Sequence, residues 1–338
     1  MKQDADVRLK QLTHWVHGFP EWREANIEVA SADASFRRYF RIRQQGRTAI
    51  VMDAPPEKEN SQLFVAIASY LEAAGVYVPR IWKQNLTAGF LLLEDLGDIL
   101  IYSQLKPSNA DRIYTQAMHS LLRIQQADTR QLSSYSAAFL RQEMEIMPAW
   151  FLYKHLGLKA TAIPHALIDK TFSALVAAVI EQPQVFVHRD FHSRNLMLTP
   201  AGKLAVIDFQ GALLGAVTYD LVSLLRDCYI YWPPQQVSQW VNQYRQQAIA
   251  AGQLAADVDE ATLQRWFDLT GLQRHIKVLG IFARLYHRDD KAGYLKDLPL
   301  VLSYVMSVGA QHAETAELVS WMQSVGIAER IGLVELAA

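Results

Sequence analysis

The sequence has little of what marks secreted, membrane-spanning or nucleic-acid-binding chains. One cysteine stands among its 338 residues, so no disulfide can form within the chain. Its charged opening residues lack the apolar stretch of a secretory signal, and no segment reaches the ~18 apolar residues of a membrane span. The 33 basic residues are balanced by 34 acidic ones, which argues against a nucleic-acid partner. We therefore expect a cytoplasmic chain that binds neither nucleic acid nor membrane.

The length of the chain provides ample material for a core, in two domains that share a cleft or in one large domain. The single cysteine, Cys228, follows Leu224-Leu225-Arg226-Asp227, and this context favours a packed helical position over a reactive thiol.

Polar side chains follow two apolar runs in the middle of the chain. The first run ends at Val187 and leads to Asp190, with Asn195 five positions later, and the second ends at Ile207, just before Asp208. This spacing is typical of phosphotransfer sites, in which one carboxylate receives the acceptor proton while an amide and a second carboxylate hold Mg²⁺. Mg²⁺ prefers hard oxygen ligands and keeps several waters, so two protein ligands are enough. Asp190 alone could belong to an ordinary loop, but the three residues together favour a catalytic site.

The pattern H-x-D-x-x-x-x-N, from His188 to Asn195, resembles the aminoglycoside phosphotransferase and choline kinase branch of the protein-kinase-like fold. In this chain Phe209-Gln210-Gly211 takes the place of the usual D-F-G continuation. The stretches Asp33–Arg41 and Leu93–Asp98 narrow the resemblance to bacterial cell-wall-recycling kinases that phosphorylate the anomeric hydroxyl of N-acetylmuramate and N-acetylglucosamine.

The resemblance implies an α+β, bilobal fold. Residues 1–97 would form a small nucleotide-binding lobe, an antiparallel sheet with a helix that ends in a hinge, and residues 98–338 a larger, mainly helical lobe. Hydrophobic periodicity agrees, since it predicts a helix up to Gly18, a helix from Glu57 to Gly75, and strand-like runs at 27–29, 36–42, 48–52, 81–82 and 90–93. In kinases of this fold the hinge backbone binds the adenine edge, a role that carries over to Glu94 and Leu96.

The turn between the first two strand-like runs, residues 30–35, contains no glycine, unlike the phosphate-covering loop of kinases. Its small residues still allow close backbone approach, and Ser31 and Ser35 add hydroxyl donors. A phosphate-covering role, in which Phe36 would also contact the nucleotide, therefore stands beside that of an ordinary hairpin turn.

The third strand-like run has Met52 where a kinase would carry a lysine that pairs with the nucleotide phosphates. Either the chain is a non-catalytic relative or another cation takes over this role. Arg37, Arg38 and Arg41 crowd the preceding strand, with Arg37 and Arg41 on one face and Arg38 on the other. We expect at least one of them to face the phosphates, although solvated strand charges remain an alternative for each.

Two further residues of the catalytic loop, His192 and Arg194, are candidates for contacts with the γ-phosphate. Arg194 could also replace part of the charge of the missing lysine. His188 is more typical of a residue that fastens the loop, and Asp220, near a predicted helix start, is placed to cap that helix or to brace the loop.

Acceptor candidates lie on two helical segments. The segment from Phe139 to Leu156 offers Glu143, Trp150 and Tyr153, although Glu143 is more typical of a surface residue and the aromatic residues of a core.

The segment from about Leu269 to His287 carries a basic stripe of Arg274, Lys277, Arg284 and Arg288, opposite an apolar stripe. A solvated face is the commoner interpretation of such a stripe. Its sign nevertheless argues against a polycationic aminoglycoside and suits an anionic acceptor or the incoming phosphates, which makes Arg274 and Arg284 substrate candidates.

We conclude that the sequence predicts a monomeric kinase that uses ATP and Mg²⁺ to phosphorylate an amino sugar, with Asp190 as the base. Other small-molecule kinases of the aminoglycoside or choline kinase type remain possible, as does a nucleotide-binding pseudokinase. A protein kinase is disfavoured, because Tyr219-Asp220 begins the next helix too soon after Asp208 for a long activation segment.

Overall fold

The computed structural model describes residues 2–32, 36–199 and 201–331, and its contacts divide the chain into two compact units. The first unit comprises residues 1–104 and 195–210, and the second comprises residues 105–194 and 211–338. The predicted lobe boundary after residue 97 stays a prediction, while the contacts group residues 98–104 and 195–210 with the first unit. Within the described ranges, none of the helices combines the length and the apolar character needed to cross a membrane.

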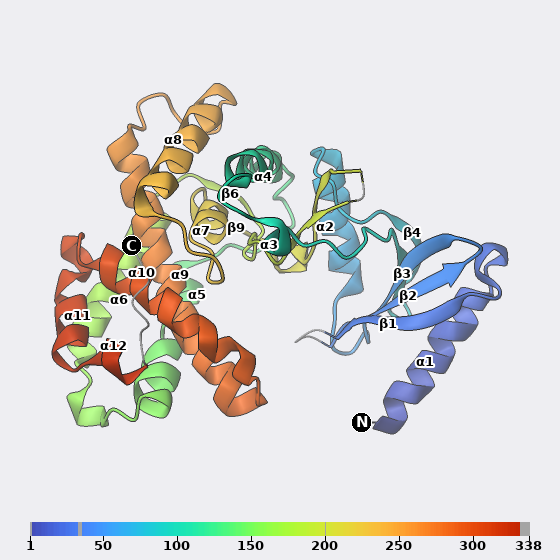
Figure 1. The fold of residues 1–338 in the computed structure, drawn as a ribbon, viewed down its shortest axis with the longest axis horizontal. Helices are drawn as coiled ribbons and strands as arrows, with labels where there is room; N and C mark the ends of the chain where they lie inside the picture. The colour runs from blue at the N-terminus through green and yellow to red at the C-terminus, as the bar shows by residue number, and fades with distance from the viewer. Residues whose placement is uncertain (1, 33–35, 200, 332–338) are drawn as a thin grey trace. The chain divides into compact units, whose positions relative to one another are not determined.

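A five-stranded antiparallel sheet organises the first unit, in the order β1-β2-β3-β5-β4 (Figure 1). The strands lie where the apolar runs predict them: β1 (Asn26–Ala32), β2 (Arg38–Gln44), β3 (Arg47–Asp53), β4 (Ile81–Asn85) and β5 (Phe90–Leu93). Helix α1 (Lys2–His17) packs Leu12 and Val16 against the apolar side chains of this sheet, and the short helix η1 (Pro20–Trp22) follows it. The predicted first helix is thus confirmed.

Helix α2 (Ser61–Ala73) begins later than predicted. The side chain of Asn60 caps it by accepting the N–H of Leu63 at 2.9 Å, and residues 56–58 form a turn before it. The prediction of a start at Glu57 was therefore wrong, because a side-chain cap decides the first turn. The helix ends before Gly75, whose φ of 76° is left-handed, as predicted.

A hairpin of β7 (Leu196–Leu198) and β8 (Leu204–Val206) also belongs to the first unit. The N–H of Leu198 donates to the carbonyl of Ile99, just before the short helix α3 (Ile101–Gln104), and the N–H of Val206 donates to the carbonyl of Tyr77, both at 2.8 Å. The short helix η4 (Phe209–Gly211) follows. These bonds tie the segment that carries Asp208 to the rest of the unit.

The second unit is mainly helical, and it contains one two-stranded sheet of β6 (Gln184–Val187) and β9 (Leu213–Ala216). Its α-helices are α4 (Ala110–Gln125), α5 (Ala137–Met144), α6 (His165–Ile180), α7 (Tyr219–Leu225), α8 (Pro234–Ala250), α9 (Glu260–Asp289), α10 (Leu298–Gly309), α11 (Ala313–Ser324) and α12 (Ile327–Arg330). Shorter or irregular helical segments are η2 (Met147–His155), η3 (Ala160–Ala162) and η5 (Ala292–Asp297). The antiparallel sheet of the first unit and the helices of the second unit together give the α+β fold that the sequence predicts.

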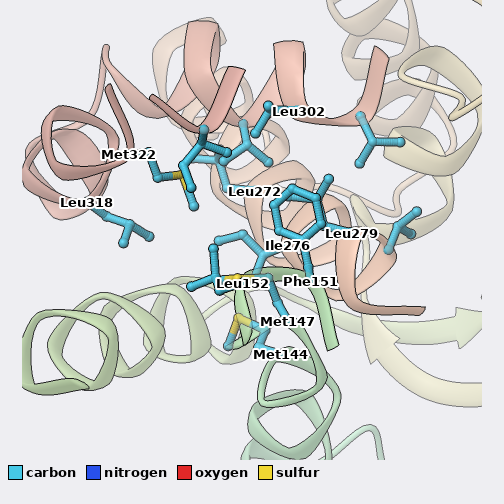
Figure 2. Packing of buried hydrophobic residues seen from close by; sticks show 14 of the residues in the cluster. Met144, Met147, Phe151, Leu152, Leu272, Ile276, Leu279, Leu302, Leu318 and Met322 are labelled. Atoms are coloured by element: carbon cyan, nitrogen blue, oxygen red, sulfur yellow. The ribbon is translucent and has the colours of Figure 1, made fainter. Parts of the chain in front are cut away.

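Helix α9 runs through the main core of the second unit, where its apolar residues contact side chains from α5, η2, α10 and α11 (Figure 2). The helix predicted over residues 139–156 is two segments, because Pro148 lacks the N–H that a continuous α-helix needs and η2 is a π-helix. Cys228 is buried in this core as predicted, but it lies in a bend after α7 and is not helical.

Gly280 is the point of closest approach between α9 and η2. A Cβ atom added there would lie 2.5 Å from the backbone nitrogen of Met147 and 2.6 Å from the carbonyl carbon of Ile146. Backbone atoms cannot move aside as a flexible side chain can, so we expect Gly280→Ala to lower the free energy of unfolding by about 1–3 kcal/mol. Thermal or denaturant unfolding of the purified variant measures this loss.

Gly271→Ala on the same helix is the matched control. Its added Cβ would meet nothing closer than a nitrogen of Arg226 at 3.5 Å, an ordinary contact, and alanine favours the helix. Equal stability of the two variants would show that the approach at Gly280 does not limit packing.

Candidate active site

The loop after β6 carries Asp190, the predicted base. Arg189 has a φ of 77°, in the left-handed region that residues other than glycine rarely adopt. The N–H groups of His188 and Arg189 donate to the two carboxylate oxygens of Asp220, at 2.6 and 2.9 Å. Asp220 lies in the first turn of α7 and is fully buried. Its bonds hold the unusual turn in place, and the predicted bracing role of Asp220 is confirmed.

A second buried carboxylate, Asp227, secures the far end of the same loop. Its oxygens accept the N–H groups of Ser193 at 2.9 Å and Tyr229 at 3.0 Å. The sequence interpretation did not single out Asp227, because it treated this stretch as part of a packed helix. The one available signal was a carboxylate close to Leu224, Leu225 and Cys228, where burial would require partners.

The charge of Asp190 is stabilised from several sides of the second unit. Desolvation acts to raise the pKa of Asp190, but the positive charges of Lys277, Arg274 and Arg189 outweigh it and lower that pKa to about 2. Asp190 is therefore a carboxylate at neutral pH, the form that can accept a hydroxyl proton. So acidic a group is a weak base, suited to orienting a hydroxyl more than to deprotonating it fully.

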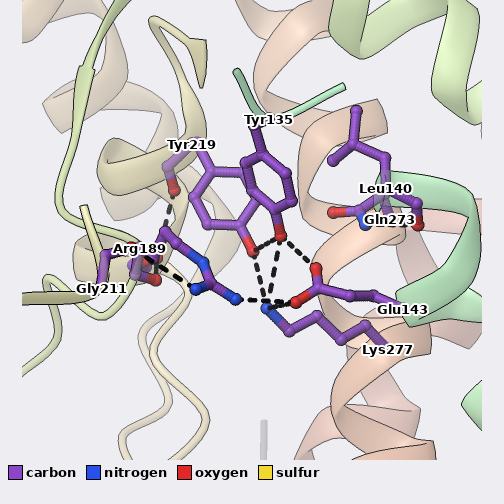
Figure 3. Close-up of polar contacts among 9 residues, drawn as sticks. Tyr135, Leu140, Glu143, Arg189, Gly211, Tyr219, Gln273 and Lys277 are labelled. Carbon is purple, nitrogen blue, oxygen red and sulfur yellow. Dashed lines mark hydrogen bonds and ion pairs between the residues drawn. The ribbon is translucent and has the colours of Figure 1, made fainter. Parts of the chain in front are cut away.

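Glu143 lies in a buried polar cluster and not on the surface, so the surface interpretation was wrong (Figure 3). Its carboxylate accepts from the Arg189 guanidinium at 2.8 Å and pairs with Lys277 Nζ at 3.1 Å. The hydroxyl of Tyr135 donates to it as well, and Lys277 Nζ also donates to the hydroxyl of Tyr219 at 3.2 Å. One carboxylate thus balances two cations, on α9 and on the catalytic loop.

The basic stripe on α9 is solvated only at its C-terminal end. Arg274 is 4% exposed and Lys277 is 7% exposed, whereas Arg284 is half-buried and Arg288 is exposed. The interpretation as a solvated face was therefore wrong for the first two residues, because other helices cover this part of α9.

The remaining loop candidates, His192 and Arg194, both contact the ring of Tyr229. The His192 ring meets the Tyr229 ring edge to face at 5.4 Å, and burial lowers the pKa of His192, so its imidazole is neutral at pH 7. The Arg194 guanidinium lies 3.5 Å from the centre of the Tyr229 ring and 4.0 Å from Asp297. Their contact with a phosphate stays a prediction.

The two predicted metal ligands, Asn195 and Asp208, lie together in the first unit. The Nδ2 atom of Asn195 donates to Oδ2 of Asp208 at 3.4 Å, and the Nε2 atom of Gln210 donates to Oδ1 at 2.5 Å. Asp208 has a φ of 63°, which turns the chain directly after β8. Oε1 of Gln210 is buried beside Asp208 without a hydrogen-bond partner among the described residues. This oxygen-rich set fits Mg²⁺, although a cluster of three or more acidic, histidine or cysteine ligands is absent from the described residues.

The arginines expected to replace the missing lysine are paired with carboxylates. Arg37, which is buried, pairs with Glu59 at 2.6 Å, and Arg38 Nε donates to Asp53 at 2.9 Å. Arg41 pairs with Asp95, to whose Oδ2 its Nε donates at 2.8 Å. Met52, at the lysine position, is buried and offers no charge.

Other nucleotide candidates are only partly described. Ser35 and the side chain of Ser31 lie outside the described residues, while Phe36 is exposed, with Lys58 Nζ 5.5 Å from its ring centre. The N–H of Glu94 donates to the carbonyl of Arg80 at 2.9 Å, so a base contact at Glu94 would use its carbonyl. Leu96 is buried against the β7–β8 hairpin.

The aromatic acceptor candidates differ in their surroundings. Trp150 is half-buried and packs against the main core, as its spacing indicates. Tyr153 is exposed, so the core interpretation was wrong for this residue. Burial lowers the pKa of Arg284 and Arg288 lowers it further, and Nε of Arg284 is buried without a partner among the described residues. The structure therefore brings Glu143 and Arg274 into the charged surroundings of Asp190, but it gives no such contact for Trp150 or Tyr153.

Comparison with known proteins agrees with these features. Residues 26–260 match the model described as "Phosphotransferase enzyme family". N-acetylmuramate/N-acetylglucosamine kinases from Pseudomonas aeruginosa and Pseudomonas putida are 42% and 41% identical to the chain, each over 93% of the chain and 95% of the relative.

Solved structures share the fold at low sequence identity. An ethanolamine kinase from Plasmodium vivax matches with a TM-score of 0.62 and 10% identity, over 84% of this chain and 83% of that one. A choline kinase from Streptococcus pneumoniae matches with a TM-score of 0.60 and 13% identity, over 91% of this chain and all (100%) of that one. These likenesses confirm the predicted fold, and the family match and the curated relatives confirm the predicted resemblance.

Replacing Asp220 by Asn should change how stability depends on pH. Burial raises the pKa of Asp220 to about 7 from the ordinary value of 3.8, even though two N–H donors and Arg274 act to lower it. Because the folded chain then holds this proton more tightly than the unfolded chain, the contribution of Asp220 to stability falls as pH rises from about 4 to about 7. We expect the Tm of the wild type minus that of Asp220→Asn to fall across this window in thermal melts.

Asp257→Asn, at an exposed position, serves as the control and should differ from the wild type by a constant amount. A constant difference for Asp220→Asn as well would contradict a buried carboxyl that titrates near neutral pH.

Proposed function

Because the chain belongs to the phosphotransferase enzyme family, we propose that it transfers the γ-phosphoryl group of ATP to N-acetylmuramate and N-acetylglucosamine. The observation that carries this proposal is the identity of 41–42% across 93% of the chain with relatives named for these two sugars. The proposed product is the α-1-phosphate of the sugar, formed at the anomeric hydroxyl, for reuse of cell-wall material. The chain would act in the cytoplasm as a monomer, with residues 1–97 as the nucleotide-binding lobe.

Asp190 is the proposed base. A carboxylate that stays charged at neutral pH can accept a hydrogen bond from a sugar hydroxyl. This bond orients the oxygen of the hydroxyl toward the phosphorus atom. The bonds from the loop to Asp220 and Asp227 support this role, because they hold the Asp190 backbone in one conformation. Phosphoryl transfer gains most from such positioning and from neutralised charge, since little covalent chemistry falls to the protein.

Asn195 and Asp208 are the proposed magnesium ligands, and Gln210 lies beside them. These side chains would hold a magnesium ion whose charge would offset that of the nucleotide phosphates. The side chains themselves offer one amide oxygen and one carboxylate, held in the first unit by the hydrogen bonds around Asp208.

Arg37 is our proposed substitute for the lysine absent at Met52. Its pairing with Glu59 supports this, because kinases of this fold pair their strand lysine with a glutamate. Arg38 is a further candidate for phosphate contact, and in the second unit we propose that His192 and Arg194 contact the transferred phosphoryl group. The backbone of Glu94 and Leu96 would bind the adenine edge, and Ser31, Ser35 and Phe36 would cover the phosphates.

The acceptor and the base can be tested in one experiment. The wild type should consume ATP with N-acetylmuramate and with N-acetylglucosamine, and it should not do so with choline, an aminoglycoside or a peptide. Asp190→Asn should lower kcat by about 10²–10⁴-fold with little change in the KM for ATP, because it removes the proton acceptor. Coupled measurement of ADP together with NMR of the sugar phosphate reports both the rate and the position of the phosphate.

Asp257→Asn should keep wild-type kinetics and controls for the loss of a carboxylate elsewhere on the second unit. Turnover only with choline or an aminoglycoside would favour another small-molecule kinase. Nucleotide binding without turnover on any acceptor would favour a pseudokinase.

The metal ligands predict a separate phenotype. Asp208→Asn should raise the Mg²⁺ concentration for half-maximal activity by about tenfold or more, because it removes the charged ligand. Calorimetric titration of ATP at several Mg²⁺ concentrations should show the same weakening without reference to turnover. Glu21→Gln, at an exposed site of the first unit, should leave both curves unchanged. An unaltered Mg²⁺ dependence in Asp208→Asn would remove this residue from the metal site.

A further inference from the structure

Arg274 is a buried cation that forms no ion pair with a carboxylate of the described residues. It is 4% exposed, and its one hydrogen bond to a described residue goes to Sγ of Cys228, at 3.2 Å. Within the described part of the chain, no carboxylate lies within ion-pair distance of its guanidinium. Burial raises the pKa of Cys228, so this thiol is neutral at pH 7 and does not balance the charge.

The other buried cations of the second unit show that such balance is the rule here. Lys277, one turn further along α9, pairs with Glu143 at 3.1 Å, and Arg226 pairs with Asp268 at 2.6 Å. Isolated charges are unfavourable in a protein interior unless they are paired, and a guanidinium cannot escape by losing its proton. The missing partner of Arg274 is therefore expected to be supplied by something that binds.

The surroundings of Arg274 point to the acceptor. Its hydrogen-bond partner Cys228 lies between Asp227, which accepts the N–H of Ser193, and Tyr229, whose ring meets that of His192. Arg274 therefore borders the loop of Asp190, the proposed base, and its charge acts on that carboxylate. The proposed magnesium ligands and the arginines Arg37 and Arg38 belong to the other unit, and the transferred phosphoryl group already has His192 and Arg194 as its proposed contacts in the second unit. An anion that binds at Arg274 is thus more simply part of the molecule whose hydroxyl meets Asp190 than part of the nucleotide.

We propose that Arg274 binds the carboxylate of N-acetylmuramate and thereby determines how the enzyme ranks its two acceptors. This inference rests on the proposed function. N-acetylmuramate carries a lactyl carboxylate that N-acetylglucosamine lacks, and the planar guanidinium matches a carboxylate with two parallel hydrogen bonds. The neutral sugar makes no such contact, so its phosphorylation depends on Asp190 and not on Arg274.

The test compares both sugars in the wild type, Arg274→Gln, Arg274→Lys and the exposed control Arg288→Gln. We expect Arg274→Gln to lower kcat/KM for N-acetylmuramate by about 10- to 100-fold, mainly through KM, as for loss of a hydrogen bond to a charged group. Its kcat/KM for N-acetylglucosamine should stay within about twofold of the wild type. Arg274→Lys should recover part of the loss, and Arg288→Gln should match the wild type with both sugars.

Stability separates this role from a structural one. Removing an unbalanced buried charge should leave the Tm of ligand-free Arg274→Gln unchanged or higher, whereas a structural arginine would lower it. Calorimetric binding of each sugar without nucleotide gives the same comparison without turnover, and Arg274→Lys keeps the test available if the glutamine variant does not fold.

The proposal would be overturned if Arg274→Gln lost kcat/KM equally with both sugars, or with neither. It would also be overturned if the wild type and both Arg274 variants bound N-acetylmuramate equally well. Failure of the wild type to phosphorylate either sugar would contradict the proposed function instead. In that case the binding comparison still decides the role of Arg274.

Discussion

The compensation of buried charge in the second unit is the constraint on which the rest of its structure depends. Helix α9 brings Arg274 and Lys277 into the interior, where a cation must find a partner or weaken the fold. Glu143 meets this need for Lys277 and also for Arg189 on the catalytic loop, so a single carboxylate links two helices to the loop. The positive charge that remains keeps Asp190 ionised. The pairing of buried cations and the ionisation of Asp190 thus have a common electrostatic origin.

The loop that carries Asp190 donates backbone hydrogen bonds to two carboxylates that take no part in the proposed chemistry. Asp220 and Asp227 together accept four backbone N–H groups, two of them at the left-handed turn of Arg189. Each of these hydrogen bonds restrains the backbone of the loop through contacts within the protein itself. A rigid loop suits phosphoryl transfer, in which orientation contributes much of the rate.

Much of this could be predicted from the sequence, because the relevant signals are local. Alternating apolar residues predict the five strands around residues 26–93, and the spacing of Asp190, Asn195 and Asp208 predicts phosphotransfer chemistry. The predicted convergence of these three residues stays a prediction, since Asp190 belongs to one unit and the two metal ligands to the other. Some errors concerned helix boundaries: α2 begins after Asn60 and not at Glu57, the helix predicted over residues 139–156 is two segments, and Cys228 is not helical. The others concerned burial, since Glu143 was taken for a surface residue and the whole stripe on α9 for a solvated face.

The sequence by itself determined the residue types and their order: which strands and helices form, which loop carries the carboxylate and the amide, and where a lysine is missing. Only the tertiary structure decided that Glu143 meets Arg189 and Lys277 and that Arg37 meets Glu59. It also decided that Arg274 is buried with no carboxylate of the described residues within ion-pair distance. The physical reason is distance along the chain. Periodicity and capping depend on neighbours within a few positions, whereas burial and charge pairing depend on which distant helices cover a residue, and packing alone determines that.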